Sequence, residues 1–242
     1  GSEMCIRDSW YVGQKQGEIW GYETYGLFQS EQEIAGAANQ DKVSGGIKLM
    51  PGDIRFVDRN NDSVIDWGDN TVDNPGDKKI IGNSTPRYHY GINLGADWKG
   101  FDLGIFFQGV GKRDLYLPGT SFRSHYGSEW QVPSAYNNDY WTEENTGAYF
   151  PRARFNGGSA INQAQTRYMV DASYCRLKSV SIGYTLPKVL TQKASIEKIR
   201  IYFTGENLFT ISDTPDGLDP ELDNPYTYPM QRSLSVGLSL TF

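Results

Sequence analysis

Apolar and polar residues alternate strictly along five segments of the chain, which is the pattern of β-strands with one apolar and one polar face. These segments span residues 88–98, 101–109, 179–187, 198–207 and 233–242. In the last segment, serine, glycine and threonine separate the apolar residues Leu234, Val236, Leu238, Leu240 and Phe242. A further strand is predicted over residues 17–28, with Trp20 and Tyr22 on one face. The pattern therefore predicts an all-β fold.

The connections between these strands are alternately short and long. Lys99 and Gly100 form a two-residue hairpin turn, and residues 187–198 form a second short connection. The long connections span residues 28–87, 108–167 and 207–232. In an antiparallel up-and-down meander, this order places the long loops at one end and the short turns at the other. Transmembrane β-barrels, which have long extracellular loops and short periplasmic turns, show the same asymmetry. A soluble meander with long loops would show it too.

Composition fits many short strands joined by polar loops. The chain has 242 residues, of which 14% are aromatic, yet its mean hydropathy is only -0.55. No run approaches the roughly 18 consecutive apolar residues of a membrane helix, whereas barrel strands hide their lipid face by alternation. Trp98, Phe101 and Phe242 would lie at the short-turn end of the strands, as part of an aromatic girdle at the membrane interface.

The number of predicted strands is too small for a closed membrane barrel. About six are clear, and the smallest membrane barrels have about eight. Unpaired backbone groups in hydrocarbon each cost several kcal/mol. We therefore expect the chain to be the C-terminal segment of a larger barrel, which does not fold alone and aggregates through open strand edges. Residues 1–9, "GSEMCIRDS", resemble a translated adapter peptide and are set aside. Residues 10–242 are expected to hold the barrel segment.

Charge and reactive side chains exclude several classes of function. The net charge of -6 and the lack of a basic run argue against nucleic acid as a partner. Two cysteines and two histidines give neither a disulfide framework nor a zinc pattern. No nucleophile, base and acid can be grouped from the sequence. We therefore expect no enzymatic activity and no required cofactor.

One acidic segment has the spacing of a calcium-binding loop. Oxygen ligands at positions one, three, five, nine and twelve would be Asp58, Asn60, Asp62, Asp66 and Asp69, with the carbonyl of Val64 at position seven. Ser63 replaces the usual glycine, which predicts a strained residue there. Asp69 replaces the usual bidentate glutamate and has a shorter reach. The alternative is a turn in which Asp and Asn side chains bond to their own backbone.

Aromatic residues in the longest predicted outer loop are candidates for substrate contact. Their faces could stack on sugar rings, and they are Trp130, Tyr140, Trp141 and Tyr149. The alternative is that they hold the loop against itself or against a partner protein. We favour this alternative, because the segment resembles a family-wide motif rather than one adapted to a substrate.

From about Trp10 to Phe242, a series of motifs resembles the late barrel of the SusC/RagA-type TonB-dependent outer-membrane transporters. In chain order, they are "PGDIRFVDRNNDSVIDWGDNTV", "IGNSTPRYHYGINLGADWKGFDLGIFFQGV", "YWTEENTGAYFPRARF", "YCRLKSVSIGYTLP", "IRIYFTGENLFTIS", "GLDPEL" and the final Phe242. The resemblance implies a barrel of about 22 strands around an N-terminal plug in the outer membrane of a Gram-negative bacterium. It also implies energy from the TonB complex, a SusD-like surface lipoprotein partner, and a glycan or peptide substrate. The plug and the earlier strands are not in this sequence.

Three functions from different classes are left to compare. The first is nutrient import across the outer membrane. The second is a soluble, calcium-dependent carbohydrate-binding β module. The third is a passive porin or adhesin barrel. A protein that is soluble and melts cooperatively without detergent would exclude the first and third. A plug and a TonB-binding segment in the same protein would distinguish the first from the third.

Overall fold

The computed structural model describes residues 10–116, 139–154, 158–191, 196–215, 218–222 and 227–242. The chain divides into two units that each contain two separate stretches of sequence. One, which we call the loop unit, comprises Gly1–Thr85 and Leu115–Val170. The other, which we call the sheet unit, comprises Pro86–Asp114 and Asp171–Phe242.

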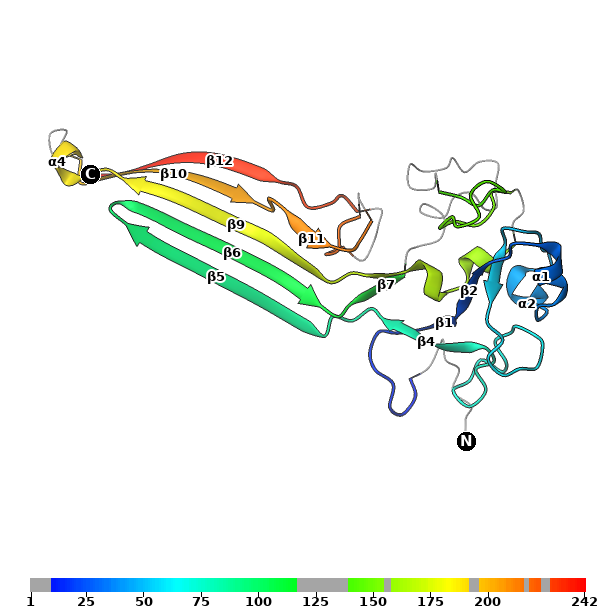
Figure 1. Ribbon diagram of the computed structural model, residues 1–242. Coiled ribbons are helices and arrows are strands. Elements are labelled where there is room, and N and C mark those ends of the chain that lie inside the picture. The colour runs from blue at the N-terminus through cyan, green and yellow to red at the C-terminus, as the bar shows by residue number, and fades with distance from the viewer. Residues whose placement is uncertain (1–9, 117–138, 155–157, 192–195, 216–217, 223–226) are drawn as a thin grey trace. The chain divides into compact units, whose positions relative to one another are not determined.

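The sheet unit is an antiparallel meander of five long strands, in the spatial order β12-β10-β9-β6-β5 (Figure 1). The strands are β5 (Tyr88–Trp98), β6 (Phe101–Gly111), β9 (Tyr174–Thr185), β10 (Lys198–Glu206) and β12 (Ser233–Thr241). Each pairs with the next long strand along the chain, so the five strands predicted from alternation and their up-and-down order are confirmed. The short strand β11 (Thr210–Ser212) also pairs with β9, and the helix α4 (Lys188–Thr191) lies between β9 and β10.

The short connections lie at one end of this sheet, as predicted. Lys99 and Gly100 have φ values of 46° and 91°, the left-handed conformation that a tight two-residue hairpin requires at both central positions. The strand register shows which other strand ends lie beside this hairpin, because Phe101 pairs with Tyr184 and Lys198 pairs with Thr241. The hairpin tip, the connection through α4 and the last residues of β12 therefore share one end, and the long connections share the other.

The two faces of the sheet differ in chemistry. One face is apolar across all five strands and is largely exposed; its exposed residues include Leu94, Leu103, Ile182, Ile201 and Leu238. The opposite face carries serine, threonine, glycine and charged residues. Because side chains alternate along a strand, the strand register holds each of these two sets of residues on a single side.

An ion pair spans three strands on the polar face. Arg200 of β10 reaches Asp102 of β6, with 2.9 Å between the guanidinium Nε and the carboxylate Oδ1. Gly183 of β9 lies beneath the contact, where an added Cβ would come within 2.5 Å of both groups. Only glycine at position 183 leaves room for the side chain of Arg200 to cross β9. Gly183 therefore permits the ion pair that joins β10 to β6 across β9.

The loop unit contains short elements. Its strands are β1 (Glu18–Tyr22), β2 (Thr24–Leu27), β3 (Ile54–Phe56) and β4 (Lys78–Asn83), and its helices are α1 (Glu31–Ala35), α2 (Asp41–Ser44), η2 (Ala160–Asn162) and η3 (Thr166–Tyr168). At its edge β7 (Asp114–Tyr116) pairs with β8 (Met169–Asp171). No helix among the residues described is both long and apolar enough to cross a membrane.

Residues 17–28 form two strands, so the prediction of a single strand there was wrong. β1 pairs with β4, and β2 pairs with β3, in two separate two-stranded sheets. The two partner strands are separated along the chain by residues 57–77. They therefore offer no continuous edge with which one long strand could pair.

The loop unit has a hydrophobic core of its own. Phe28, Val43, Ile54, Ile65 and Tyr168 are fully buried. Tyr22 packs on Phe56, with ring centroids 5.3 Å apart, and Phe150 stacks on Tyr168 at 5.9 Å. Much of the sequence that alternation left as long loops between strands is therefore a packed unit.

Candidate functional site

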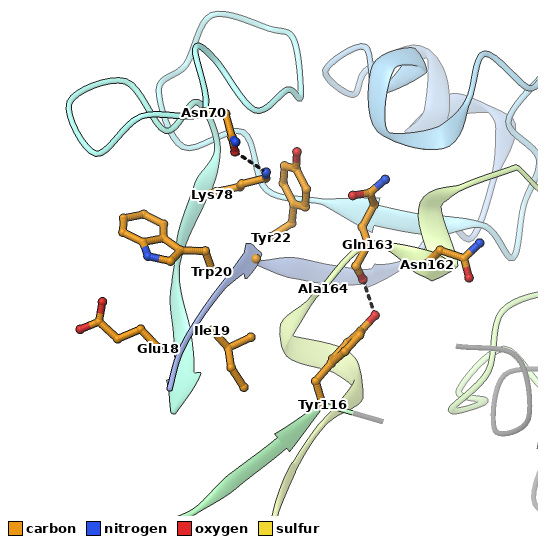
Figure 2. A pocket seen from close by; sticks show the side chains of 11 residues that line it. Glu18, Ile19, Trp20, Tyr22, Asn70, Lys78, Tyr116, Asn162, Gln163 and Ala164 are labelled. Atoms are coloured by element: carbon orange, nitrogen blue, oxygen red, sulfur yellow. Dashed lines mark hydrogen bonds between the residues drawn. The ribbon is translucent and has the colours of Figure 1, made fainter. Parts of the chain in front are cut away.

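A cavity of about 430 Å³ opens in the loop unit beside strand β1 (Figure 2). All of its lining residues belong to that unit, and they come from β1, the loop before β4, the first residue of β4, the last residue of β7, and the end of η2 with the two residues after it. The volume is within the range of small-ligand sites. The cavity is thus one place in the loop unit where a ligand could be held between several elements.

The edge of β1 forms one wall of the cavity. The backbone N–H of Tyr22 donates to the carbonyl of Ala164 at 2.8 Å, and Tyr22 forms a parallel bridge with Gln165. An added Cβ on Gly21 would lie 2.4 Å from the carbonyl oxygen of Ala164, so glycine permits this close approach. Strand pairing therefore begins at Tyr22, and the cavity lies where the two segments separate.

Polar groups around the cavity are mostly engaged with each other. Lys78 donates to the Oδ1 of Asn70 at 2.9 Å, and the Tyr116 hydroxyl donates to the carbonyl of Gln163 at 2.6 Å, as Figure 2 shows. Glu18 accepts hydrogen bonds from the Tyr11 hydroxyl and from the backbone N–H of Lys15. The charges of Glu18 and Lys78 balance, so the lining is neutral overall.

Tyr22 is a buried phenol next to this cavity. Burial raises the pKa of its hydroxyl, and the negative charges of Asp77 and Asp66 raise it further. The side chain therefore stays protonated at every physiological pH. Among the residues that the structure describes, this hydroxyl has no hydrogen-bond partner.

The acidic segment 58–69 is a series of turns closed by its own side chains. Asp58 accepts from the backbone N–H groups of Asn61 and Ser63, at 2.7 and 2.9 Å. Asp62 accepts from the N–H of Val64 at 2.8 Å and from the amide of Asn60 at 2.8 Å. Ser63 has a φ of 65°, so the predicted strain at the position usually held by glycine is confirmed.

The remaining carboxylates of this segment have partners elsewhere. Asp66 lies 2.6 Å from the ammonium of Lys42 and accepts from the N–H of Gly68. These two donors lower the pKa of Asp66. Asp69 accepts from the amide of Asn74 at 2.7 Å. In the described part of the chain, no three acidic, histidine or cysteine side chains converge as metal ligands, and calcium binding stays a prediction.

Calorimetric titration with Ca²⁺ tests this prediction. If the segment binds calcium, the ion must displace the hydrogen bonds of Asp58 and Asp62, and Asp62→Ala is expected to abolish the heat of binding because it removes a ligand at position five. Asp73→Ala is the control, since this exposed carboxylate lies outside the segment. If the unaltered chain gives no heat of binding with Ca²⁺, the prediction of a calcium site is wrong.

The aromatic residues predicted to contact substrate lie in different surroundings. Trp130 is outside the described residues. Trp141 is buried: its indole N–H donates to Gln29 at 3.1 Å, and the Arg152 guanidinium lies 5.1 Å from its ring. Tyr149 packs edge-on against neighbouring rings, and its hydroxyl donates to a backbone carbonyl at 3.0 Å. Tyr140 is exposed. The contacts of Trp141 and Tyr149 are those of the alternative in which these residues hold the loop together.

A buried ionic cluster in the sheet unit was not predicted. Arg176 of β9 lies 2.6 Å from Asp219 and 2.7 Å from Glu221, and all three side chains are almost fully buried. Lys178 also reaches Glu221, at 2.9 Å. The acidic residues are in the connection between β11 and β12, so the cluster fastens that connection to the sheet. The sequence signal that could have indicated an acidic partner is the pair of cationic residues two positions apart, Arg176 and Lys178.

Comparison with known proteins gives matches over almost the whole chain. No family model matches. The chain is 31% identical to TonB-dependent receptor P3 of Formosa agariphila over 95% of its length, and 27% identical to receptor P26 of the same organism over 96%. These alignments cover 22% and 23% of the two relatives. The chain therefore spans less than a quarter of the length of these relatives.

Solved structures match the fold. A chain of the RagAB peptide transporter matches with a TM-score of 0.68 at 22% identity, over 96% of this chain and 23% of that one. The RagAB peptide importer in its open-open state gives a TM-score of 0.67 at 21% identity, with the same coverage of both chains. At this identity, the likeness shows the fold. In sequence the chain is thus similar to a segment of TonB-dependent receptors, and its antiparallel β fold is that of a segment of the RagAB transporter chains.

Proposed function

We propose that the chain forms part of the barrel of an outer-membrane, TonB-dependent nutrient importer. The observation that carries this proposal is the sheet unit, in which one apolar face runs unbroken across five antiparallel strands and is left exposed. A face of this kind is stable against lipid, and the polar face opposite would then line the barrel interior. The names of the curated relatives and of the solved structures support import rather than catalysis.

The ends of the sheet support an orientation in the membrane. Trp98, Phe101 and Phe242 are exposed at the end with the short connections, where they would form an interfacial aromatic girdle. That end is proposed to face the periplasm. The long connections, which leave the sheet at its other end, would then begin on the extracellular side.

Partners and cargo follow from the same proposal. The solved RagAB structures are named as a peptide importer and a peptide transporter. The receptor containing this chain is proposed to act with a SusD-like surface lipoprotein, to draw energy from the TonB complex, and to import a glycan or a peptide. The packed loop unit would supply the surface on which such a lipoprotein and the cargo meet.

A pair of arginine substitutions on adjacent residues of β9 tests the lipid-facing assignment. Ile182 is on the apolar face between Leu103 and Phe203, whereas Ser181 is on the polar face. Ile182→Arg is expected to cost about 1–3 kcal/mol, because an arginine on the lipid face must be desolvated, and this cost falls from its midplane value toward the interface, which lies two residues away at Phe101 and Tyr184. Ser181→Arg is expected to cost much less.

The measurement is the amount of the receptor containing this chain that reaches the outer membrane of an expressing cell in folded form, read by fractionation and by heat-dependent gel mobility. Loss with Ile182→Arg and retention with Ser181→Arg support the proposal. If both variants are equally well tolerated, or if the unaltered protein is soluble without detergent, the barrel assignment fails.

A further inference from the structure

The polar face of the sheet is buried more deeply at the end with the long connections than at the other end. Gln108 of β6 lies on the same face as Asp102, six residues earlier, because the pairing of β6 with β5 is regular over this stretch. Gln108 pairs with Arg176 of β9, whose side chain is only 4% exposed. At the other end, the side chain of Asp102 is 31% exposed. Something in the chain therefore covers this face around Arg176.

The covering segment is residues 218–222, which we call the strap. Its three consecutive residues 219–221 each accept hydrogen bonds from side chains of β9 or of the residue that follows β6; the donors are Arg113, Tyr174, Arg176 and Lys178. In the middle, the carbonyl of Pro220 lies 2.8 Å from a guanidinium nitrogen of Arg113, and Pro220 is buried. Donors from both β9 and the end of β6 thus hold the strap against the polar face.

The chain that returns from the strap toward β12 is fastened to it as well. The backbone N–H of Met230 donates to the Oδ2 of Asp219 at 2.9 Å, while the Oδ1 of the same carboxylate accepts from the N–H of Glu221 at 3.0 Å. Both oxygens of Asp219 therefore have backbone donors in addition to the guanidinium of Arg176. The strap is held in one conformation by these bonds as well as by its contacts with the sheet.

The strap and the face beneath it have complementary charges. Three of the four donors are cations, namely Arg113, Arg176 and Lys178, and the strap supplies the carboxylates of Asp219 and Glu221. A concave surface lined with charges of one sign concentrates solutes of the opposite sign. With the strap in place, the cations are instead paired within the protein and face its carboxylates and a carbonyl.

We propose that the strap is folded into the barrel, where it masks the cations of Arg113, Arg176 and Lys178 from the passage near its extracellular end. The barrel wall at this level presents the strap, and a passing solute meets paired charges instead of a surface that attracts anions. The strap is thus a determinant of charge selectivity. Its place inside a barrel rests on the proposed function, because only then does the polar face line an interior; the masking of the cations does not.

The first test measures whether the strap is covered. It uses the detergent-solubilised receptor that contains this chain, with Cys175→Ala to remove a native thiol. Pro220→Cys places a thiol in the strap and keeps the carbonyl that Arg113 binds, whereas Asp213→Cys places one in an exposed part of the same connection. A charged thiosulfonate reagent is expected to modify Pro220→Cys roughly a hundredfold more slowly, because reaction there requires the strap to open.

The second test measures the charge that the strap masks. Gln108→Cys places a thiol beside Arg176, and its rates with an anionic and a cationic thiosulfonate are compared. Asp219→Asn combined with Glu221→Gln preserves side-chain size but removes both carboxylate charges, so the anionic reagent is expected to gain roughly tenfold over the cationic one. Asp213→Asn combined with Glu206→Gln is the control, since it makes the same change of net charge at exposed positions and is expected to leave the ratio unchanged.

The ratio of the two rates separates masking from a purely structural role, because general loosening would speed both reagents alike. Equal rates at Pro220→Cys and Asp213→Cys, or an unchanged ratio at Gln108→Cys, would overturn the proposal. If Pro220→Cys does not fold, the ratio at Gln108→Cys decides alone. A receptor that shows the Ile182 and Ser181 pattern above without these effects refutes the strap only. These effects in a protein that is soluble without detergent refute the barrel, and with it the place of the strap in a passage.

Discussion

Replacement of Arg176 with methionine is expected to destabilise the sheet unit by about 3–5 kcal/mol, the usual cost of breaking a buried ion pair by removing one partner. The guanidinium of Arg176 contacts both Asp219 and Glu221 at ion-pair distance. Without it, Asp219 stays buried without its cation. Glu221 keeps Lys178 and the hydroxyl of Tyr174, at 2.9 Å each, so most of the cost falls on Asp219.

Denaturant titration of the detergent-solubilised receptor that contains this chain measures this cost, and limited proteolysis reports whether the connection carrying Asp219 is released. Lys178→Met is the matched control, because Lys178 is more exposed and contacts Glu221 alone; about 1 kcal/mol or less is expected. Equal effects of the two substitutions would show that the buried pair is not what fastens the connection.

The same cluster predicts a pH dependence. Burial by itself raises the pKa of Asp219, but hydrogen bonds from Arg176 and from the N–H groups of Glu221 and Met230 outweigh it and lower the pKa. The stabilisation is therefore complete above the unfolded-state pKa of about 3.9 and is lost as the pH falls from there through the lowered folded-state value. Proteolysis of the connection should rise below about pH 4, and Arg176→Met should remove part of that dependence.

Replacement of Trp141 with alanine is expected to destabilise the loop unit by about 3–5 kcal/mol, the range for removing a buried large aromatic side chain. Its ring packs against Gly52, where an added Cβ would come within 2.6 Å. Its indole N–H bonds to Gln29. The substitution would leave a cavity and an unpaired amide oxygen.

Tyr140→Ala is the comparison, since this neighbouring aromatic side chain is exposed; a change of about 1 kcal/mol or less is expected. Thermal unfolding followed by near-ultraviolet circular dichroism distinguishes the two. If Trp141→Ala left stability intact and weakened oligosaccharide binding, the residue would be a sugar-stacking platform after all.

The sheet unit could be predicted because its signal is local. Alternation over 88–98 and 101–109 sets which side chains share a face, and Lys99–Gly100 supply the turn conformation that joins the two segments. The remaining strands alternate in direction, and the length of each connection indicates the end of the sheet at which it lies. Nothing distant in the sequence is needed to obtain this arrangement.

The loop unit could not be predicted in the same way, because its contacts join distant residues. Trp141 is buried by Gln29 and Gly52, roughly a hundred residues earlier, and β1 finds its partner only at β4. Short strands such as β3 have three residues, too few to show a period. The burial of Arg176 likewise depends on Asp219, which lies in a segment without regular pattern.

Gly183, beneath the ion pair of Arg200 and Asp102, also acts as a check on strand alignment. If β9 slid by two residues against β6 and β10, its apolar side chains would still face the same way, so burial alone would not oppose the slip. Ser181 or Thr185 would then lie where Gly183 lies now, and their side chains would obstruct the path between the guanidinium and the carboxylate. The absence of a side chain at Gly183 thus favours the native register of β9 over the registers shifted by two residues.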